Sequence, residues 1–309
     1  MSMTTSVEGF HYAVSSRKGS SARKPMEDTH KSMRTTINIL DQDSKQAEAV
    51  SFFGVFDGHG GRKAADFAAE NIGPNIVDAM KNQVKLAGDT SEVDITDKNN
   101  EILSNKNLEE AVRAGYLKTD KEFLDEVVPR GVFPSGTTCV TALIINGKLV
   151  VSNAGDSRAV ISRSRNGAEA LTIDHRPGTE SERQRIQKLV GIVMNRQGVL
   201  RLGALSVSRA IGDAGLAKDR QWLTAEPDTR IIQITSDDEF LILATDGLWD
   251  KVTNQEAVDI ARPFCIQSLP GGPVAACEKL VELAVDRQSP VDITVMIVQL
   301  HHFNQFKED

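Results

Sequence analysis

The sequence predicts one α+β domain whose sheet is at least partly antiparallel. Short apolar runs rich in Val, Ile and Phe alternate with segments whose apolar residues recur at helical spacing. Asn146-Gly147 and Gly155-Asp156-Ser157 each separate two apolar runs by a few turn-forming residues, which is typical of β-hairpins. No internal repeat, long linker or shift in composition marks a domain boundary, so residues 1–309 are treated as a single domain.

The apolar runs themselves are the expected strands. They lie at 35–40, 49–56, 140–145, 148–154, 158–163, 239–245 and 292–300. Residues 1–10 and 301–309 are expected to be terminal tails. The stretch 83–106 is polar and weakly periodic, so it is expected to be a surface excursion.

Helical periodicity appears between these runs. It predicts helices over about 62–80, 108–128 and 273–286. Thr179 with Glu182, and Thr253 with Glu256, match the capping box, in which a hydroxyl and a carboxylate three residues later satisfy the first backbone N–H groups. Two further helices are therefore expected to start at these threonines.

Composition excludes several classes of function. The net charge is −7 and the lysines and arginines are scattered, which argues against nucleic acid as a partner because such a partner needs a basic face. The three cysteines, Cys139, Cys265 and Cys277, are far apart, which suits a reducing compartment. No secretory signal, membrane span or lipidation motif is recognised. We expect a monomer located in the cytoplasm, the nucleus or both.

Several acidic residues stand at the ends of apolar runs, where side chains can converge on one pocket. Asp57 ends the run 52–56 and precedes Gly58-His59-Gly60-Gly61, where a tight turn could bring a backbone carbonyl close to a ligand. Asp246 follows the run 239–245, and Asp250 comes four residues later, so one turn of chain could present both carboxylates.

Further candidates lie elsewhere along the chain. Asp156 stands at the expected hairpin tip, Glu27-Asp28 forms an acidic pair with Arg23 upstream, and Asp292 begins the last expected strand. Such a set offers oxygen ligands without the Cys and His spacing that zinc prefers, so Mg²⁺ or Mn²⁺ is expected. Two such ions can activate a water and clamp a phosphate, which indicates a phosphoester hydrolase.

Each feature also has a plainer interpretation when it is taken alone. Asp57-Gly58 could be an ordinary turn, and Glu27-Asp28 a solvated charge pair. His59 could be a surface residue, or a proton donor to a leaving alcohol beside a bound phosphate. The residues alone leave these alternatives open.

Seven segments taken together in order resemble the metal-dependent protein phosphatase 2C family. They are RKPMED (23–28), FFGVFDGHGG (52–61), SGTT (135–138), NAGDSRAV (153–160), DHRP (174–177), LSVSRAIGD (205–213) and LATDGLWD (243–250). The resemblance covers nearly the whole chain. It implies a four-layer α-β-β-α sandwich, with two antiparallel sheets packed face to face, flanking helices and a metal pair at one end.

The resemblance also implies roles for the candidate residues. Asp57 would bridge two ions, the Gly58 carbonyl would bind one of them and Asp246 the other. Glu27 and Asp28 would act through metal-bound water. Arg23 would hold the substrate phosphate and His59 would be the general acid, while Asp156, Asp246 and Asp250 would form a third, weaker ion site. Residues 189–201 and those after 213 would form the flap beside the cleft.

The chain departs from the family at one position. The last family signature has an Asp that ligates a metal, and this chain has Val291 there, with Asp292 one residue later. In a regular strand a one-residue offset turns a side chain to the opposite face, so only an irregularity such as a bulge would let Asp292 substitute. Both outcomes stay open.

The expected function is metal-dependent hydrolysis of phosphoserine and phosphothreonine in proteins. An alternative is a pseudophosphatase that binds phosphoproteins without turnover because Val291 weakens the metal site. Hydrolysis of small phosphate esters is a third hypothesis, which the metal chemistry alone does not exclude.

Overall fold

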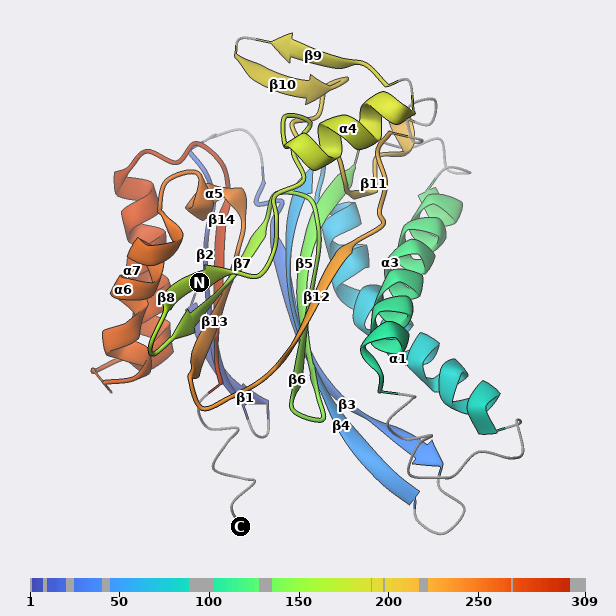
Figure 1. Cartoon of the computed structure of the whole chain (residues 1–309). Helices are drawn as coiled ribbons and strands as arrows, with labels where there is room; N and C mark the ends of the chain where they lie inside the picture. Colours follow the sequence, from blue (N-terminus) through green and yellow to red (C-terminus); the bar gives the residue numbers. More distant parts are fainter. Residues whose placement is uncertain are drawn as a thin grey trace.

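Two antiparallel sheets form the centre of the molecule (Figure 1). The computed structural model describes residues 2–7, 10–20, 25–40, 45–88, 103–127, 135–189, 191–196, 198–216, 222–267 and 269–300. The first sheet has the order β1 (Ser2–Val7), β2 (Phe10–Arg17), β14 (Ile293–Gln299), β13 (Asp238–Ala244), β7 (Arg158–Arg163) and β8 (Gly167–Ala170). The second has the order β12 (Asp228–Gln233), β6 (Lys148–Ala154), β5 (Gly136–Ile145), β4 (Lys45–His59) and β3 (Thr29–Leu40), and β11 (Ile211–Gly212) pairs with β5.

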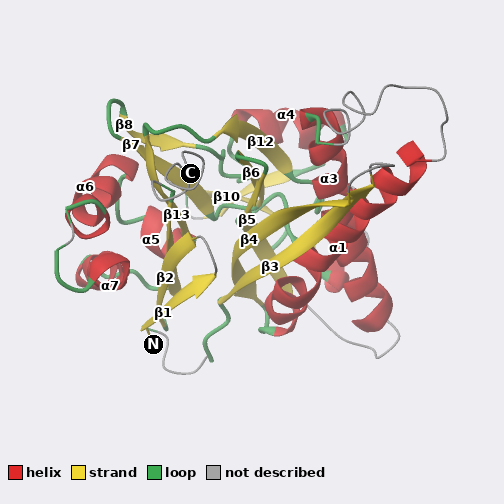
Figure 2. Ribbon diagram, turned by 90° about the horizontal axis from the view of Figure 1, so that it is seen from below, coloured by secondary structure: helices red, strands yellow, loops and turns green. Residues whose placement is uncertain are grey.

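Helices cover the outer face of each sheet, as the view from below shows (Figure 2). The second sheet is covered by α1 (Lys63–Gly88) and α3 (Asn105–Val127), and the first by α6 (Asn254–Cys265) and α7 (Gly272–Asp286). The short helix α5 (Asp246–Trp249) follows β13 directly. These layers confirm the four-layer sandwich. None of the helices in the described ranges is long and apolar enough to cross a bilayer.

The run Phe52–Phe56 shows why β4 lies at the centre of the fold. Alternate residues of a strand point to opposite faces of the sheet. Phe53 and Val55 join the apolar cluster between the two sheets, whereas Phe52 and Phe56 join the cluster beneath α1 and α3. A strand buried on both faces reads as a continuous apolar run. The long β4 therefore fixes where its end at His59 lies.

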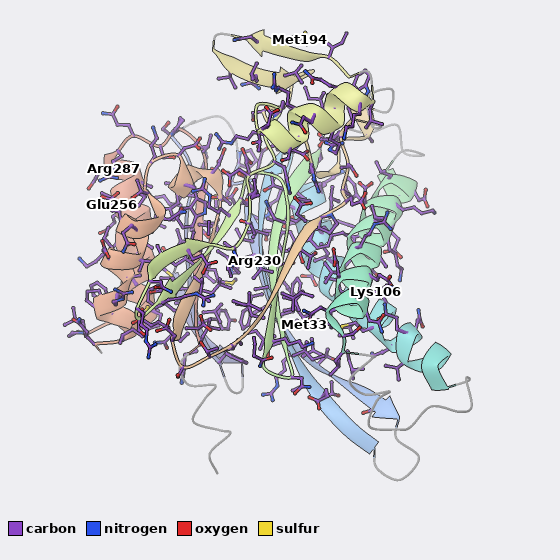
Figure 3. All side chains as sticks on the ribbon, viewed as in Figure 1. Met33, Lys106, Met194, Arg230, Glu256 and Arg287 are labelled. Atoms are coloured by element: carbon purple, nitrogen blue, oxygen red, sulfur yellow. The ribbon has the colours of Figure 1, made fainter. Side chains whose placement is uncertain are left out.

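Polar contacts complement this packing at the edges of the sheets. Arg230 of β12, labelled in Figure 3, donates hydrogen bonds to the Glu169 carboxylate and the Ala170 carbonyl of β8. This contact joins an edge strand of one sheet to an edge strand of the other. Arg287 and Glu256, also labelled, form an ion pair on the outer helical layer.

A separate lobe lies above the sheets at one end (Figure 1). It consists of α4 (Glu180–Lys188) and a hairpin of β9 (Val193–Arg196) and β10 (Val199–Leu202). Figure 3 labels Met194 on this hairpin, away from the two sheets. A small apolar cluster, which includes Ile186, Leu202 and Leu223, holds the lobe together. The lobe contains the segment expected to be the flap.

Several expectations about local structure are wrong. Residues 2–7, expected in a tail, form β1 and pair with β2. Residues 155–157 are not a hairpin, because β6 and β7 belong to different sheets and this segment crosses between them. The helix expected to end at 80 continues to Gly88 despite Pro74. Thr179 begins α4, but its hydroxyl bonds the Asp174 carbonyl rather than capping the helix.

Other expectations are confirmed. Asn146 and Gly147 have φ angles of 46° and 72° and join β5 to β6 as a hairpin. The Thr253 hydroxyl accepts a hydrogen bond from the Glu256 N–H and caps α6.

The expected surface excursion 83–106 is not confirmed. Residues 83–88 belong to α1 and residues 105–106 to α3. Residues 89–102 lie outside the described residues, as does the expected tail 301–309, so these expectations stay predictions.

Candidate metal centre and active site

A pocket opens at the end of the sandwich where β4 and β13 end and β14 begins. The acidic residues that line it are Glu27, Asp57, Asp156, Asp246 and Asp292. Arg201 of β10 in the lobe also lines the pocket, as does Val207 in the segment that follows. Residues from five separate parts of the sequence therefore meet at one site, as the sequence predicts for the strand-end carboxylates.

Asp57 lies at the centre of this group. Strand β4 does not turn at Asp57 but continues to His59, paired with β5 as far as Gly136, and the turn follows at Gly60 and Gly61. Burial, reinforced by the negative charges of Asp28 and Asp246, raises the pKa of Asp57 well above its usual range. The carboxylate therefore lacks a compensating cation among the groups that determine its pKa.

Asp28 is almost fully buried beside Asp57. Its Oδ2 accepts hydrogen bonds from the hydroxyls of Thr294, at 2.8 Å, and Thr245, at 3.2 Å. Its Oδ1 is buried and has no hydrogen-bond partner in the described part of the chain. Burial raises the pKa of Asp28 to about 7, although the Thr294 hydroxyl opposes the shift, and the charges of Asp292 and Asp246 add to it.

Asp292 ties the loop before β3 to the start of β14. Its two carboxylate oxygens accept the backbone N–H groups of Gly19 and Glu27, both at 2.7 Å. Strand β14 begins only at Ile293, so the alternation rule does not decide where the side chain points. Asp292 and Val291 both line the pocket. No bulge is needed to bring Asp292 there, but both of its oxygens already accept hydrogen bonds.

Two glycines allow backbone segments to approach closely around the carboxylates. A Cβ on Gly58 would lie 2.3 Å from the Glu27 carbonyl oxygen, and one on Gly247 would lie 2.1 Å from that of Asp292. Any larger residue would push these segments apart. The Glu27 carboxylate in turn accepts the Gly61 N–H at 2.8 Å. The glycines after Asp57 and Asp246 are therefore required by packing as well as by turns.

Asp156, on the crossing segment, and Asp246, at the start of α5, line the pocket, and Asp250 follows α5 close to Asp246. Burial raises the pKa of Asp156 to about 7, and the charge of Asp246 adds to the shift. Burial also raises the pKa of Asp246, and the next contribution comes from Asp250. Arg176 contacts Asp156 and Asp250. We call Asp28, Asp57, Asp156 and Asp246 the acidic cluster.

His59 has a partner that the sequence analysis missed. Its Nε2 lies 3.0 Å from both carboxylate oxygens of Asp213. Burial by itself lowers the pKa of His59, but the hydrogen bond and charge of Asp213 outweigh it, so the pKa is raised. The family resemblance of the segment 205–213 indicated that it could belong to the site, but the sequence does not reveal which of its residues faces His59.

The backbone around Asp213 is held in an unusual conformation. Asp213 has a φ of 57° in the left-handed region, which costs a residue other than glycine about 1 kcal/mol. Its N–H donates to the Ser135 carbonyl at 2.9 Å, and the preceding Gly212 N–H donates to Asp120 at 2.9 Å. A Cβ on Gly136 would lie 2.2 Å from Asp213 Oδ2 and 2.5 Å from His59 Nε2. The surroundings therefore fix this pair tightly.

Known proteins match the chain along most of its length. The sequence model described as Protein phosphatase 2C matches residues 12–292. The chain belongs to this family. "Probable protein phosphatase 2C 30" of Arabidopsis thaliana and "Probable protein phosphatase 2C 32" of Oryza sativa subsp. japonica are 47% and 46% identical to it. Each match covers 96% of this chain and 68% of the relative.

A solved structure extends the comparison to the fold. Serine-threonine phosphatase 2C from Toxoplasma gondii has a TM-score of 0.75 and 26% identity, over 97% of this chain and 99% of that one. The resemblance found in the sequence is therefore confirmed, together with the enzyme class, a protein serine/threonine phosphatase.

The described residues fit the divalent ions that this family implies. The four carboxylates of the acidic cluster have raised pKa values, and the buried Asp28 Oδ1 has no hydrogen-bond donor among the described residues. Within the described ranges, no three His, Cys, Asp or Glu side chains are already arranged as a chelating group. Mg²⁺ keeps several of its waters when it binds, so a set with few direct protein ligands suits it. Arg23, the expected phosphate ligand, lies outside the described residues.

Proposed function

We propose that the chain hydrolyses phosphoserine and phosphothreonine in proteins with the help of divalent cations, Mg²⁺ or Mn²⁺, bound at the acidic cluster. The observation that carries the proposal is the cluster itself. Buried like charges are costly unless cations neutralise them. Family membership supports phosphatase activity, and the raised pKa values support an ion centre as its means.

The residues would divide the work as follows. Asp57, the Gly58 carbonyl and Asp246 would bind two ions directly, while Glu27 and Asp28 would hold metal-bound water. Bound divalent ions lower the pKa of a water and polarise phosphoryl oxygens. The carboxylates would fix where that chemistry takes place, because Asp57 lies near the end of β4, Asp28 accepts the Thr294 hydroxyl and Glu27 accepts the Gly61 N–H.

His59 would protonate the leaving alkoxide of the substrate. Asp213 engages Nε2, so a proton delivered to substrate would leave from Nδ1. A serine or threonine alkoxide is a poor leaving group, so a positioned proton donor contributes about 100- to 10,000-fold. The raised pKa of His59 keeps the ring protonated to higher pH and supports this role.

A pseudophosphatase is the second candidate, and one observation favours it. Asp292 already uses both carboxylate oxygens to accept backbone N–H groups, and Val291 offers no ligand atom. The presence of two cluster carboxylates and a positioned histidine, Asp57, Asp246 and His59, weighs against a pseudophosphatase. Phosphopeptide binding without turnover would not require these three side chains together.

Hydrolysis of a phosphothreonine peptide by the purified protein tests the proposal. Activity should appear as Mn²⁺ or Mg²⁺ is titrated and disappear with a chelator. Turnover that is independent of divalent ions would contradict the ion-based mechanism. Absence of turnover at every ion concentration, with phosphopeptide binding retained, would favour the pseudophosphatase.

A further inference from the structure

Arg176 lies between Asp156, which lines the pocket, and Asp250. Its Nε is 3.0 Å from Asp156 Oδ2, and its Nη2 donates a hydrogen bond to Asp250 Oδ1 at 2.7 Å. Asp156 lies on the segment that crosses between the sheets, and Asp250 follows α5. One guanidinium therefore bridges carboxylates from two separate elements.

Arg176 is the main positive charge that the described structure places on these carboxylates. Within the described ranges, it is the one Arg or Lys that forms an ion pair with a member of the acidic cluster. The positive charge of Arg176 opposes the rise in pKa of both Asp156 and Asp246. A guanidinium stays protonated at any physiological pH, so this charge cannot be removed by titration.

We propose that Arg176 is a built-in cation that occupies the position between Asp156 and Asp250 and competes with a divalent ion for it. The guanidinium contacts one oxygen of each carboxylate, Asp156 Oδ2 and Asp250 Oδ1, and its charge repels a cation that binds beside it. An ion that takes these two oxygens therefore displaces Arg176. The inference rests on the proposed function, because it concerns the third, weaker ion at that same centre.

The contacts of Arg176 permit such a displacement. Its side chain is 36% exposed, and solvent can therefore receive the guanidinium. Its buried Nε has no hydrogen-bond partner in the described part of the chain, so the contact with Asp156 is an ion pair without hydrogen-bond geometry. Within the described ranges, the guanidinium donates its one side-chain hydrogen bond to Asp250. The third ion is expected to bind weakly, and only once its concentration is high enough to displace Arg176.

Equilibrium dialysis with Mn²⁺, with free Mn²⁺ measured by electron paramagnetic resonance, tests this competition without any substrate. The wild-type protein and Arg176→Gln are compared over a range of Mn²⁺ concentrations. In Arg176→Gln the dissociation constant of the most weakly bound ions should fall by about tenfold or more, because removing a unit charge a few ångströms away changes the binding free energy by at least that much at a partly exposed site. The dissociation constant of the tightly bound ions should be unchanged.

Three further variants make the result specific. Arg183→Gln is the matched control, since Arg183 pairs with Glu180 on the surface of α4, and it should leave every class unchanged. Adding Asp250→Asn to Arg176→Gln should abolish the tightening. Arg176→Lys keeps the charge but loses the planar guanidinium, so the dissociation constant of the weakly bound ions should fall less than in Arg176→Gln. Arg176→Lys also serves as the test variant if Arg176→Gln fails to fold.

The outcomes separate this inference from the proposed function. An unchanged weak class in Arg176→Gln, with the tight class present, overturns the role of Arg176 alone. Equal tightening with and without Asp250 overturns it as well. Absence of the tight class in the wild-type protein contradicts the ion-based function itself, and the inference falls with it. A protein that shows the expected shift but hydrolyses no phosphopeptide supports the inference and contradicts the proposed phosphatase activity.

Discussion

Two groups of buried charges in this molecule shift their pKa values in opposite directions. In the acidic cluster, burial and mutual repulsion raise the pKa of Asp28 and Asp156 to about 7. In α4 of the lobe, burial also disfavours the charge on Glu182, yet hydrogen bonds from Arg185 and Arg209 lower its pKa to about 2. We call Glu182, Arg185, Arg209 and Asp228 the arginine network.

The difference lies in the partners of the carboxylates. Glu182 accepts hydrogen bonds from both arginines and from the Ser208 hydroxyl, and Arg209 also pairs with Asp228. These contacts satisfy the buried charge from within the chain, as a structural ion pair requires. Among the described residues, Arg176 is the one cationic side chain that forms an ion pair with the acidic cluster. Buried carboxylates without enough cationic partners in the described structure indicate a site for cations, whereas buried carboxylates that are paired with arginines indicate a role in stabilising the fold.

Neutralising Asp57 should cause the largest loss of activity among these variants. Asp57→Asn keeps the shape of the side chain but removes the charge expected to bridge two ions. Phosphopeptide turnover should fall by about 100- to 1,000-fold, comparable to the loss of a major electrostatic group in other active sites. Initial rates at saturating Mn²⁺ measure it. Activity within a few-fold of the wild-type protein would show that Asp57 is not at the centre of the chemistry.

Asp213 offers a test of how the chain positions its proton donor. Asp213→Asn should leave the ring of His59 less well oriented and lower kcat for a phosphothreonine peptide by about 10- to 100-fold, with little change in KM. An aryl phosphate, whose leaving group needs no proton, should lose much less. Equal losses on the two substrates would mean that Asp213 supports the fold rather than the proton donor.

Glu182→Gln should damage stability rather than ion binding. It leaves Arg185 and Arg209 without their buried partner and should lower the free energy of unfolding by about 2–3 kcal/mol at pH 7. Because the pKa of Glu182 is lowered from 4.5 to about 2, its stabilisation is present above pH 4.5 and is lost as the pH falls toward 2. Urea unfolding between pH 7 and 3 should show the free energies of unfolding of the wild-type protein and of Glu182→Gln converging as the pH falls.

The control for this variant is Glu180→Gln, on the exposed face of the same helix. Glu180 pairs with Arg183 in solvent, and such pairs contribute little. Its unfolding curve should match that of the wild-type protein. A loss as large as that of Glu182→Gln would mean that helix charge, not the arginine network, accounts for the effect.

Val291→Asp should have the smallest effect and should strengthen the acidic cluster. Val291 is 43% exposed and lines the pocket, so a carboxylate there can reach a bound ion without disturbing the core. We expect the Mn²⁺ concentration for half-maximal activity to fall by roughly several-fold, since added ligand charge tightens ion sites. Val291→Asn is the neutral control. An unchanged requirement in Val291→Asp would mean that Asp292 or another group already fills the role.

Much of this arrangement could be predicted from the sequence because the signals are local. Asp57 lies near the end of β4 and Asp246 just after β13, and the run 52–56 is apolar because β4 is buried on both faces. Asn146-Gly147 forms the expected hairpin because the turn depends on only those residues.

The remaining features depend on contacts between distant parts of the chain. Gly155-Asp156 resembles a hairpin turn locally, but the two strands beside it pair in different sheets. The Asp213 carboxylate faces His59 across 154 residues, and Arg176 faces Asp250 across 74. Sequence spacing carries no information about such pairs, so only the fold reveals them.

The thermal stability of the purified protein with and without Mn²⁺ tests the central claim most directly. The claim is that the acidic cluster binds divalent cations. Saturating Mn²⁺ should raise the melting temperature of the wild-type protein and of Glu182→Gln by roughly 5 °C or more, because the ion binds only the folded state. It should raise that of Asp57→Asn far less. Equal shifts in all three proteins, or no shift in the wild-type protein, would contradict the claim.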